Sequence, residues 1–437
     1  MTQSLRETAI RFRLVRFALG TFFLARGTAY RLLGNEYRFL NDYGWTARVA
    51  DVWPLTGLAR RAVMAAVRRF QAGPNTLVDS YLRNPASDAC ASLYTITGKG
   101  KHDLLRDLIV LKRSTADEKG VILLKYARTF DAVVALFELD RLMERYTFVL
   151  EPCWAGYWDP SLLMFIARRQ PVFVQCFTAD DLALVEAIGD PLVPLRMGPA
   201  DWVDADLFTK PEGTEKTHDL VMVANWAPGK RHAELFRAVA KVDRPVRVLL
   251  IGFPWFGRTQ ADIRREAAAI GNGRMTLDIL ERLPAAEVSQ RVGACKVFVF
   301  LSRKEGDSKA LVEALFADVP AIVFDKTVGG APSRINASTG MLASDEDLPA
   351  AIERMLDRHH EFAPRAWALE HTGSAFTTQS LSEHVRRVIT AQGGRFTEPL
   401  VEKTNSPNLA YKDPASRAAF QADYEWILST RRAGPRG

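Results

Sequence analysis

Short apolar runs alternate with amphipathic helical patterns along most of this 437-residue chain, from about residue 90 onward. Each apolar run is long enough for one strand, and the helical stretch after it is long enough to cross back over a sheet. This alternation predicts βαβ units, and therefore parallel sheets covered by helices on both faces. A polar stretch at 205–217, which includes Lys210-Pro211-Glu212-Gly213, separates two such series and is typical of an interdomain linker.

The two series predict two Rossmann-like domains in an α/β chain. In the first series we expect strands at 91–97, 121–126, 147–150, 172–176 and 192–195, and helices at 101–112, 129–145, 160–169 and 179–188. In the second we expect strands at 220–224, 246–251, 275–279, 297–301 and 321–324, and helices at 230–241, 259–270, 285–293, 308–317 and 346–357. The predicted parts are a basic helical extension at 1–75, a first domain at 76–205, a second domain at 206–391, and a tail with a final helix at 392–437. Open α/β sheets bind ligands beyond the carboxyl ends of their strands, so we expect the site in a cleft between the two domains.

The positive charge of the chain is concentrated near its N-terminus. Residues 1–70 contain twelve arginines, no lysine and four acidic residues, a net of +8, whereas the whole chain carries +7. The longest uncharged run there, Phe17 to Ala25, is far shorter than the roughly 20 residues that span a bilayer. Arginines interleaved with aromatic residues favour an interfacial helix on anionic lipid, and a helical extension with its arginines in water is the alternative. The basic segment matches no nucleic-acid module, so no nucleic-acid partner is expected.

The most informative local pattern follows the expected strand 297–301. Glu305 and Gly306 lie in the strand-to-helix loop, and Glu313 lies eight positions after Glu305, in the next helix. Glycine permits close backbone approach, and the free amides at the helix start, around residues 307–310, attract an anion. Glu305 could accept hydrogen bonds from sugar hydroxyls and Glu313 from ribose hydroxyls, so the pattern suits a nucleotide sugar and needs no metal.

Residues 305–323 resemble the E-G-x6-E-A block, followed by a proline-containing strand, of the retaining glycosyltransferase family 4. The resemblance implies a GT-B fold, in which two Rossmann-like domains face each other across a cleft. It also implies that Glu305 contacts the donor sugar and Glu313 the ribose. The glycines in 328–342 are similar to the glycine-rich loop that follows this block in the family.

The segment 221–232 resembles the strand, loop and helix that open the donor domain of that family. Lys230 matches the second of two basic residues that neutralise the diphosphate, whereas Asn225 stands where the first is usually arginine. Arg231 or Lys309 could substitute for the missing cation. The predicted catalytic residues are therefore Glu305 and Lys230, and the predicted donor-binding residues are Asn225, Gly306, Asp307, Ser308, Lys309 and Glu313.

The first domain carries weaker signals for the acceptor. Gly98 and Gly100 form a glycine loop after an expected strand, and Glu151 and Trp154 begin an aromatic stretch at another strand end. A plain turn and an aromatic plug between domains explain these segments equally well. The Asp-x-Asp of 204–206 lies at the linker and reads as local capping, so no metal and no cofactor beyond the donor are expected.

Together these patterns predict a cytoplasmic glycosyltransferase, peripheral at the inner face of the cell membrane if residues 1–70 contact lipid. It would move a sugar from a nucleotide-diphosphate sugar to a carbohydrate or lipid-linked hydroxyl acceptor, in surface polysaccharide or glycolipid synthesis. A nucleotide-sugar epimerase and a non-catalytic module that binds a sugar or a partner protein are the alternatives.

Overall fold

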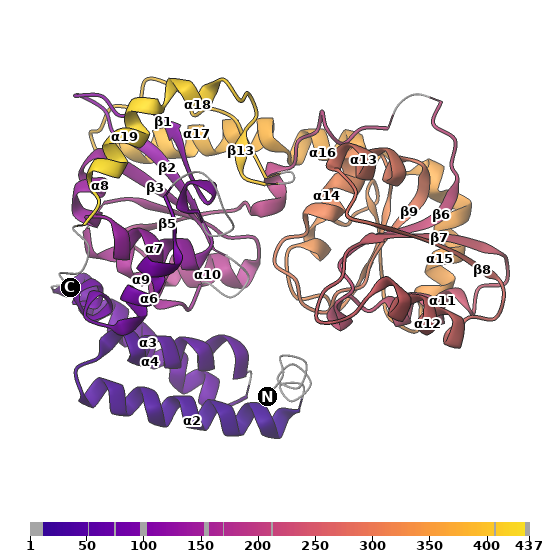
Figure 1. Ribbon diagram of the computed structural model, residues 1–437, viewed down its shortest axis with the longest axis horizontal. Coiled ribbons are helices and arrows are strands. Elements are labelled where there is room, and N and C mark those ends of the chain that lie inside the picture. Colours follow the sequence, from indigo (N-terminus) through magenta and orange to yellow (C-terminus); the bar gives the residue numbers. More distant parts are fainter. Residues whose placement is uncertain are drawn as a thin grey trace. The chain divides into compact units, whose positions relative to one another are not determined.

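The chain divides into two compact units. We describe it from a computed structural model, which covers residues 12–50, 52–73, 76–96, 103–152, 157–168, 170–210, 213–405 and 408–432. The first unit comprises Met1–Met197, Thr378–Lys403 and Leu409–Gly437, and the second comprises Gly198–Thr377 and Thr404–Asn408. Each α/β series forms one sheet, as Figure 1 shows. The predicted boundary at 205/206 falls later than the observed one, and residues 378–391, expected in the second domain, belong to the first unit.

The first unit is built on a five-stranded sheet in the order β1-β2-β3-β4-β5. Its strands are β1 (Leu108–Lys112), β2 (Gly120–Lys125), β3 (Tyr146–Glu151), β4 (Val172–Gln175) and β5 (Leu192–Leu195). Strands β2 to β5 are parallel, whereas β1 is antiparallel to β2. The helices around the sheet are α7 (Ala127–Leu136), α8 (Leu139–Arg145), α9 (Pro160–Leu163), α10 (Ala179–Ile188) and α17 (Ser374–Ala391).

Two expected elements of this unit are wrong. The expected strand 91–97 is occupied up to Leu93 by the helix α6 (Pro85–Leu93), which Asn84 caps by accepting a hydrogen bond from Ala86 N. The expected helix 101–112 instead contains the strand β1, all of whose residues are buried. A short, continuously apolar run fits a buried strand as well as a buried helix, so periodicity could not separate them.

The C-terminal segment covers the free edge of β1. Tyr424 Oη accepts a hydrogen bond from Val110 N at 3.2 Å, and Tyr411 Oη donates to Val110 O at 2.7 Å. Val401 N donates to Leu111 O at 2.8 Å. These contacts satisfy backbone groups that an edge strand leaves unpaired. The segment includes β12 (Lys403–Thr404), β13 (Ala410–Tyr411), α18 (Ser416–Ala419) and α19 (Gln421–Ser429), and Figure 1 shows α18 and α19 near β1.

The N-terminal region is helical, as predicted. It consists of α2 (Arg13–Leu32), α3 (Glu36–Trp45), α4 (Leu55–Ala72), α5 (Leu77–Leu82) and α6, with a π-helical turn η1 (Thr46–Ala50). Arg26 joins α2 to α3 through two 2.7 Å hydrogen bonds to the Asp42 carboxylate. Gly27 allows the close packing, because a Cβ there would lie 2.8 Å from the Tyr43 ring. Among the described helices, none is both long enough and apolar enough to cross a membrane.

The second unit is built on a six-stranded parallel sheet in the order β11-β10-β9-β6-β7-β8. Its strands are β6 (His218–Val223), β7 (Val246–Gly252), β8 (Met275–Glu281), β9 (Cys295–Phe300), β10 (Ala321–Phe324) and β11 (Gly340–Ala343). Its helices are α11 (His232–Val239), α12 (Gln260–Ile270), α13 (Ala285–Gly293), α14 (Lys309–Phe316), α15 (Leu348–Arg358) and α16 (Pro364–His371). Separate apolar cores cover the two faces of this sheet, as expected for a parallel sheet between helices. The strand β11 was not predicted.

Candidate functional site

Three loops of the second unit meet at one edge of its sheet. They follow the carboxyl ends of the neighbouring strands β6, β9 and β10, at 224–231, 301–308 and 325–330. In open α/β sheets this edge is where ligands bind. The loops contain Lys230, Glu305 and a pair of glycines, so three of the segments that the sequence singled out lie at the same edge.

Lys230 and Glu305 form an ion pair across two of these loops. Lys230 ends the short 3-10 helix η5 (Pro228–Lys230), and its Nζ donates a hydrogen bond to Glu305 Oε2. The two side chains are 20% and 30% exposed, so both remain accessible to water. An ion pair of this exposure contributes only about 0–1 kcal/mol. An anionic ligand could therefore compete for Lys230 at small cost.

The glycine loop after β10 packs against the backbone of Glu305. Glu305 N donates to Val328 O at 3.0 Å, and Gly330 N donates to Gly306 O at 2.9 Å. Gly329 has φ +145°, and a Cβ there would lie 2.2 Å from Glu305 O. The absence of a side chain at Gly329 thus sets the position of the Glu305 loop.

Gly329→Ala is expected to lower the free energy of unfolding of the second unit by more than about 2 kcal/mol, because a left-handed conformation and a backbone clash are combined. Gly257→Ala is the matched control and should cost only about 1 kcal/mol. Gly257 has φ +72°, and apart from its chain neighbours no atom of the described residues lies within 4 Å of the position that its Cβ would take. Urea denaturation of both variants measures the difference. Equal losses would show that the contact with Glu305 O does not constrain the loop.

The side chain of Asp307 is bound to protein groups. Its side chain has no exposed surface and accepts hydrogen bonds from Arg334 Nη2 at 2.7 Å and from Ala200 N at 3.0 Å. Arg334 Nη1 also donates to Asp201 Oδ1 at 2.8 Å, which in turn accepts from Thr372 Oγ1 at 2.6 Å. The side chain of Asp307 therefore holds the loop in place, and a donor contact through its backbone amide stays a prediction.

The pKa values of the two carboxylates beside Arg334 are shifted in opposite directions, because burial outweighs the arginine at only one of them. Burial raises the pKa of Asp307 above its ordinary value, despite the nearby Arg334. Burial also opposes the charge of Asp201, but Arg334 and the hydrogen bond from Thr372 outweigh it and lower that pKa. Burial alone would lower the pKa of Arg334, but its two carboxylate partners outweigh burial and raise this pKa above its ordinary value. Sequence reasoning missed this cluster, because Asp201 and Arg334 are separated by 133 residues.

The remaining predicted cations of the donor site are engaged elsewhere. Lys309 Nζ donates to Asn405 O at 2.8 Å. Arg231, with φ +65°, binds the Asp345 carboxylate through two 2.6 Å hydrogen bonds and lies over the Phe324 ring. Both side chains thus have protein partners in this structure, and the replacement of the missing basic residue by one of them stays a prediction.

The other predicted donor residues play local roles or are half-buried. Asn225 Oδ1 accepts from Ala227 N at 3.1 Å, and Ser308 Oγ caps α14 by accepting from Leu311 N at 3.3 Å. Glu313 is half-buried on α14 between buried neighbours. Donor contacts for Asn225, Gly306, Ser308 and Glu313 stay predictions.

His232 lies beside the site but adds no charge to it. Its ring has no hydrogen-bond partner among the described residues and packs edge-on against Trp226, with ring centroids 5.4 Å apart. Burial, together with Arg258 and Lys230, lowers its pKa to about 3. The imidazole is therefore neutral at physiological pH and cannot serve there as a cationic phosphate ligand.

In the first unit, Glu151 is buried at the carboxyl end of β3. Its carboxylate lies 3.4 Å from Lys403 Nζ and 3.9 Å from Lys125 Nζ, and both lysines are buried. Gly98, Gly100 and Trp154 lie outside the described residues. An acceptor-side role for Glu151 stays a prediction, although two lysines already neutralise its charge.

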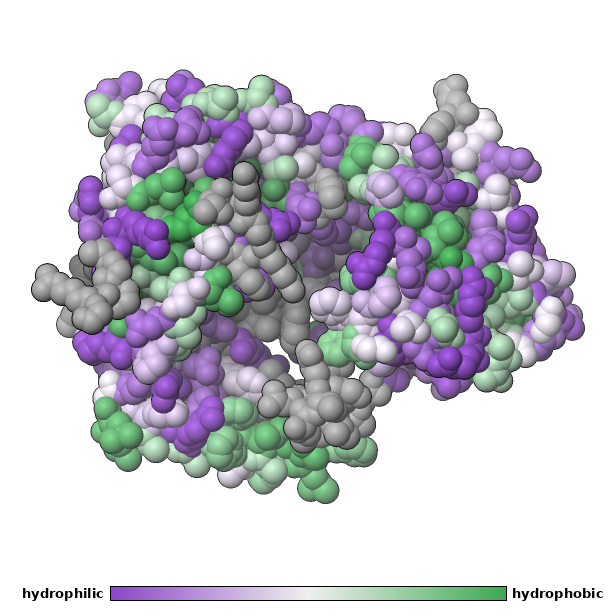
Figure 2. Space-filling model, viewed as in Figure 1, coloured by the Kyte–Doolittle hydropathy of each residue, from purple (hydrophilic) through white to green (hydrophobic). Residues whose placement is uncertain are grey.

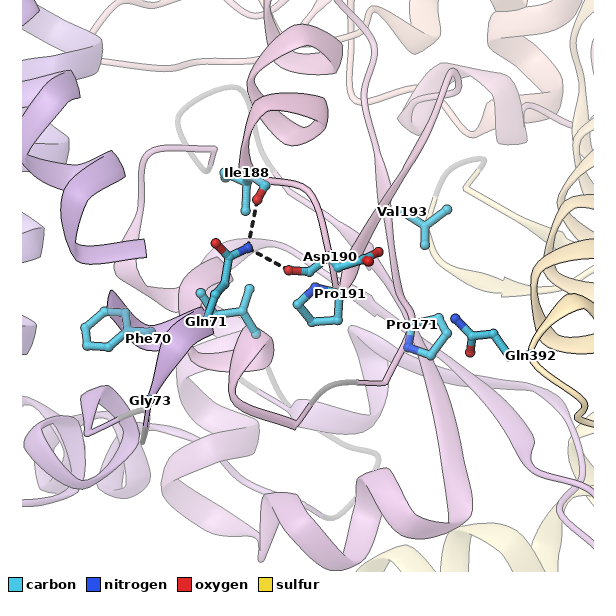
Figure 3. Close-up of a pocket in the computed structure, with 10 residues that line it drawn as sticks. Phe70, Gln71, Gly73, Pro171, Ile188, Asp190, Pro191, Val193 and Gln392 are labelled. Atoms are coloured by element: carbon cyan, nitrogen blue, oxygen red, sulfur yellow. Dashed lines mark hydrogen bonds between the residues drawn. The ribbon is translucent and has the colours of Figure 1, made fainter. Parts of the chain in front are cut away.

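A cavity of about 550 Å³ opens in the first unit, at the opposite ends of the strands from Glu151. Pro171 and Pro191 line it just before β4 and β5, and α4 contributes Gln71, which donates to the carbonyls of Ile188 and Asp190 (Figure 3). The cavity thus lies at the amino ends of the strands, away from Glu151. Among the described residues that line it, the predicted acceptor residue Glu151 does not occur.

The comparisons identify the second unit. Residues 204–363 match the model of the family described as Glycosyl transferases group 1. This part of the chain is a glycosyltransferase group 1 domain. It contains Lys230, Glu305, Asp307 and Glu313. With the two Rossmann-like units and the helical N-terminal region, it confirms the predicted GT-B fold class, whereas membership of family 4 stays a prediction.

Several solved structures are similar to the chain that carries this group 1 domain. Anabaena Alr3699/HepE in complex with UDP and glucose is 17% identical, with 61% of this chain and 78% of that chain covered at a TM-score of 0.46. Sucrose-phosphate synthase from Thermosynechococcus elongatus is 16% identical, with 62% of this chain and 74% of that chain covered at a TM-score of 0.47. The pneumococcal O-GlcNAc transferase GtfA in complex with UDP and GlcNAc is 16% identical, with 57% of this chain and 54% of that chain covered at a TM-score of 0.43. A search of curated proteins gave no significant match.

Proposed function

We propose that this chain transfers a sugar from a nucleotide-diphosphate sugar to a hydroxyl acceptor. The observation that carries the proposal is the Lys230–Glu305 pair at the carboxyl edge of the sheet, inside the group 1 domain. A cation and a carboxylate from segments 75 residues apart meet where α/β sheets bind ligands. An ammonium suits a diphosphate, and a carboxylate suits sugar hydroxyls.

In this proposal Lys230 and the amides at the start of α14 bind the diphosphate, Glu305 accepts from hydroxyls of the sugar, and Glu313 accepts from the ribose. Negative charge develops on the diphosphate as the bond to the sugar breaks. Fixed donors and cations that meet this charge are the largest catalytic contribution in such sites. We propose that the configuration at the anomeric carbon is retained, that the sugar is a hexose, and that no metal or other cofactor takes part.

The ion pair also explains how Lys230 stays in place before a donor binds. Glu305 holds the Lys230 ammonium between the two loops, where it stays partly exposed to water. When a diphosphate arrives, Lys230 exchanges one anionic partner for another, and Glu305 becomes free to accept from the sugar. The loop that carries Glu305 is fixed by Gly329 and by the buried Asp307–Arg334 contact, so little ordering of the backbone is needed.

For the acceptor, we propose a carbohydrate or a lipid-linked hydroxyl compound bound by the first unit, in surface polysaccharide or glycolipid synthesis. A basic N-terminal region would bring the enzyme to the cytoplasmic face of the membrane, where lipid-linked acceptors are found. The net charge of +8 in residues 1–70 supports this placement.

A thermal-shift screen of nucleotide sugars is expected to reveal one donor class that raises the Tm of the full-length protein. A ligand at 100 times its Kd stabilises the native state by about 2.7 kcal/mol, which is several degrees. The donor that shifts Tm is then tested for release of the nucleotide with and without candidate acceptors. If no nucleotide sugar shifts Tm or is turned over, the proposal fails. Formation of an epimer of the donor sugar without acceptor would support the epimerase instead.

A further inference from the structure

The outward face of α2 is exposed and uncharged along the whole helix. Its residues, all exposed, are Leu14, Phe17, Ala18, Thr21, Phe22, Ala25, Thr28, Ala29 and Leu32. At 100° per residue they occupy an arc of about 140°. Leu14 and Leu32 are each 84% exposed, and Phe17 and Phe22 are 44% and 54% exposed. Figure 2 shows apolar residues gathered over α2 at the lower edge of the view.

The two threonines do not make this face polar. Thr21 Oγ1 donates to Phe17 O at 3.0 Å, within the helix. Thr28 Oγ1 donates to Leu24 O at 2.8 Å and also contacts Tyr43 Oη at 2.8 Å. Because both hydroxyls already have partners, moving the face out of water leaves no hydrogen bond of these groups unmade.

The charges of α2 are all positive. The helix contains four arginines and no acidic residue. Arg26 is held by Asp42, whereas Arg13 and Arg31 are exposed near the two ends of the helix. On the helical wheel Arg26 borders one side of the uncharged arc, and Arg13 and Arg31 border the other. An apolar face bordered by arginines is the arrangement of helices that lie in the surface of an anionic bilayer.

Charge and shape favour a lipid surface over a second copy of the chain. Two copies packed through this face would bring the same arginines together, which is unfavourable. The helix is about 30 Å long, and its face has small residues between the large ones and no charged residue that could anchor a specific protein partner. We therefore propose that α2 lies parallel to the surface of an anionic membrane, with this face among the acyl chains and its exposed arginines at the phosphates. This inference does not depend on glycosyl transfer.

Vesicle co-sedimentation of the full-length protein tests this inference. Binding is expected with vesicles of phosphatidylcholine and about 30% phosphatidylglycerol, and is expected to be several-fold weaker with phosphatidylcholine alone or in high salt. Phe17→Ser/Phe22→Ser should lower the partition coefficient by more than about tenfold, because two large apolar groups no longer enter the bilayer. Circular dichroism and Tm check that the variant is folded.

The matched control is Leu369→Ser/Phe376→Ser, which alters two residues of the second unit with similar exposures, 50% and 44%. This variant should bind vesicles like the unchanged protein. The inference is overturned if the unchanged protein does not bind anionic vesicles, or if both double variants bind equally well. It is also overturned if sedimentation shows a dimer that Phe17→Ser/Phe22→Ser dissociates while vesicle binding is absent.

Discussion

Lys230→Ala is expected to lower kcat/KM for the nucleotide-sugar donor by about 10²–10³-fold, with a change in Tm of only about 2 °C or less. The large effect on turnover follows from the loss of the cation that would face the leaving diphosphate, while Glu305 stays behind as an unopposed negative charge. The small effect on stability follows from exposure: the two side chains are 20% and 30% exposed, so water can replace the lost contact. Steady-state kinetics and thermal denaturation of the same preparation measure both quantities.

A double-mutant cycle with Glu305→Gln makes this prediction sharper. Residues that act as a unit show strongly non-additive effects, so the double variant should lose much less than the product of the two single losses. Lys241→Ala and Glu370→Gln, at exposed positions of the same unit, are the matched controls and should retain full turnover. If Lys230→Ala turns over donor at the unchanged rate, the assignment of the site is wrong.

All elements of the second unit's sheet except the strand β11 could be predicted, because their signals are local. Strands β6, β7, β9 and β10 are short apolar runs, and Ser308 and Thr259 cap the starts of α14 and α12 as a sequence pattern suggests. The first unit was harder to predict at its edge. The strand β1 is completed by Tyr411 and Tyr424, which follow Val110 by 301 and 314 residues. No window of local sequence contains that information.

The site shows the same division between local and distant information. The sequence singled out Glu305 by its loop after a strand and Lys230 by the resemblance to the donor domain of a known family, and the structure brings the two together. It could not show that Asp307 and Lys309 turn to other partners, because Arg334 and Asn405 follow them by 27 and 96 residues. A carboxylate next to a loop glycine can bind a ligand or hold the loop in place, and which of the two it does depends on residues that are distant in the sequence and close in the fold.

Arg334→Met is expected to destabilise the second unit by about 3–5 kcal/mol at pH 7. The variant leaves the Asp201 and Asp307 carboxylates buried without their shared cation, and removal of one partner from a buried charge cluster has a cost of this size. Urea denaturation gives the overall change, and hydrogen exchange in β9 and β10 locates it in the second unit. Arg291→Met, which removes an arginine 54% exposed beside Glu287, is the control and should change stability by less than about 0.5 kcal/mol.

The pH dependence of this loss identifies the two carboxylates as its cause. In the unchanged protein Arg334 lowers the pKa of Asp201, so the stability that Asp201 contributes is present at neutral pH and declines as pH falls through that pKa. Burial raises the pKa of Asp307, so its contribution runs the other way and is larger at low pH. Without Arg334, burial is expected to raise both pKa values, and the deficit of Arg334→Met should shrink by at least about 1 kcal/mol between pH 7 and pH 5. Asp201→Asn/Asp307→Asn in the Arg334→Met background should recover much of the stability at pH 7 and lose this pH dependence. A deficit that is the same at both pH values would show that lost packing, and not unpaired charge, is what the arginine prevents.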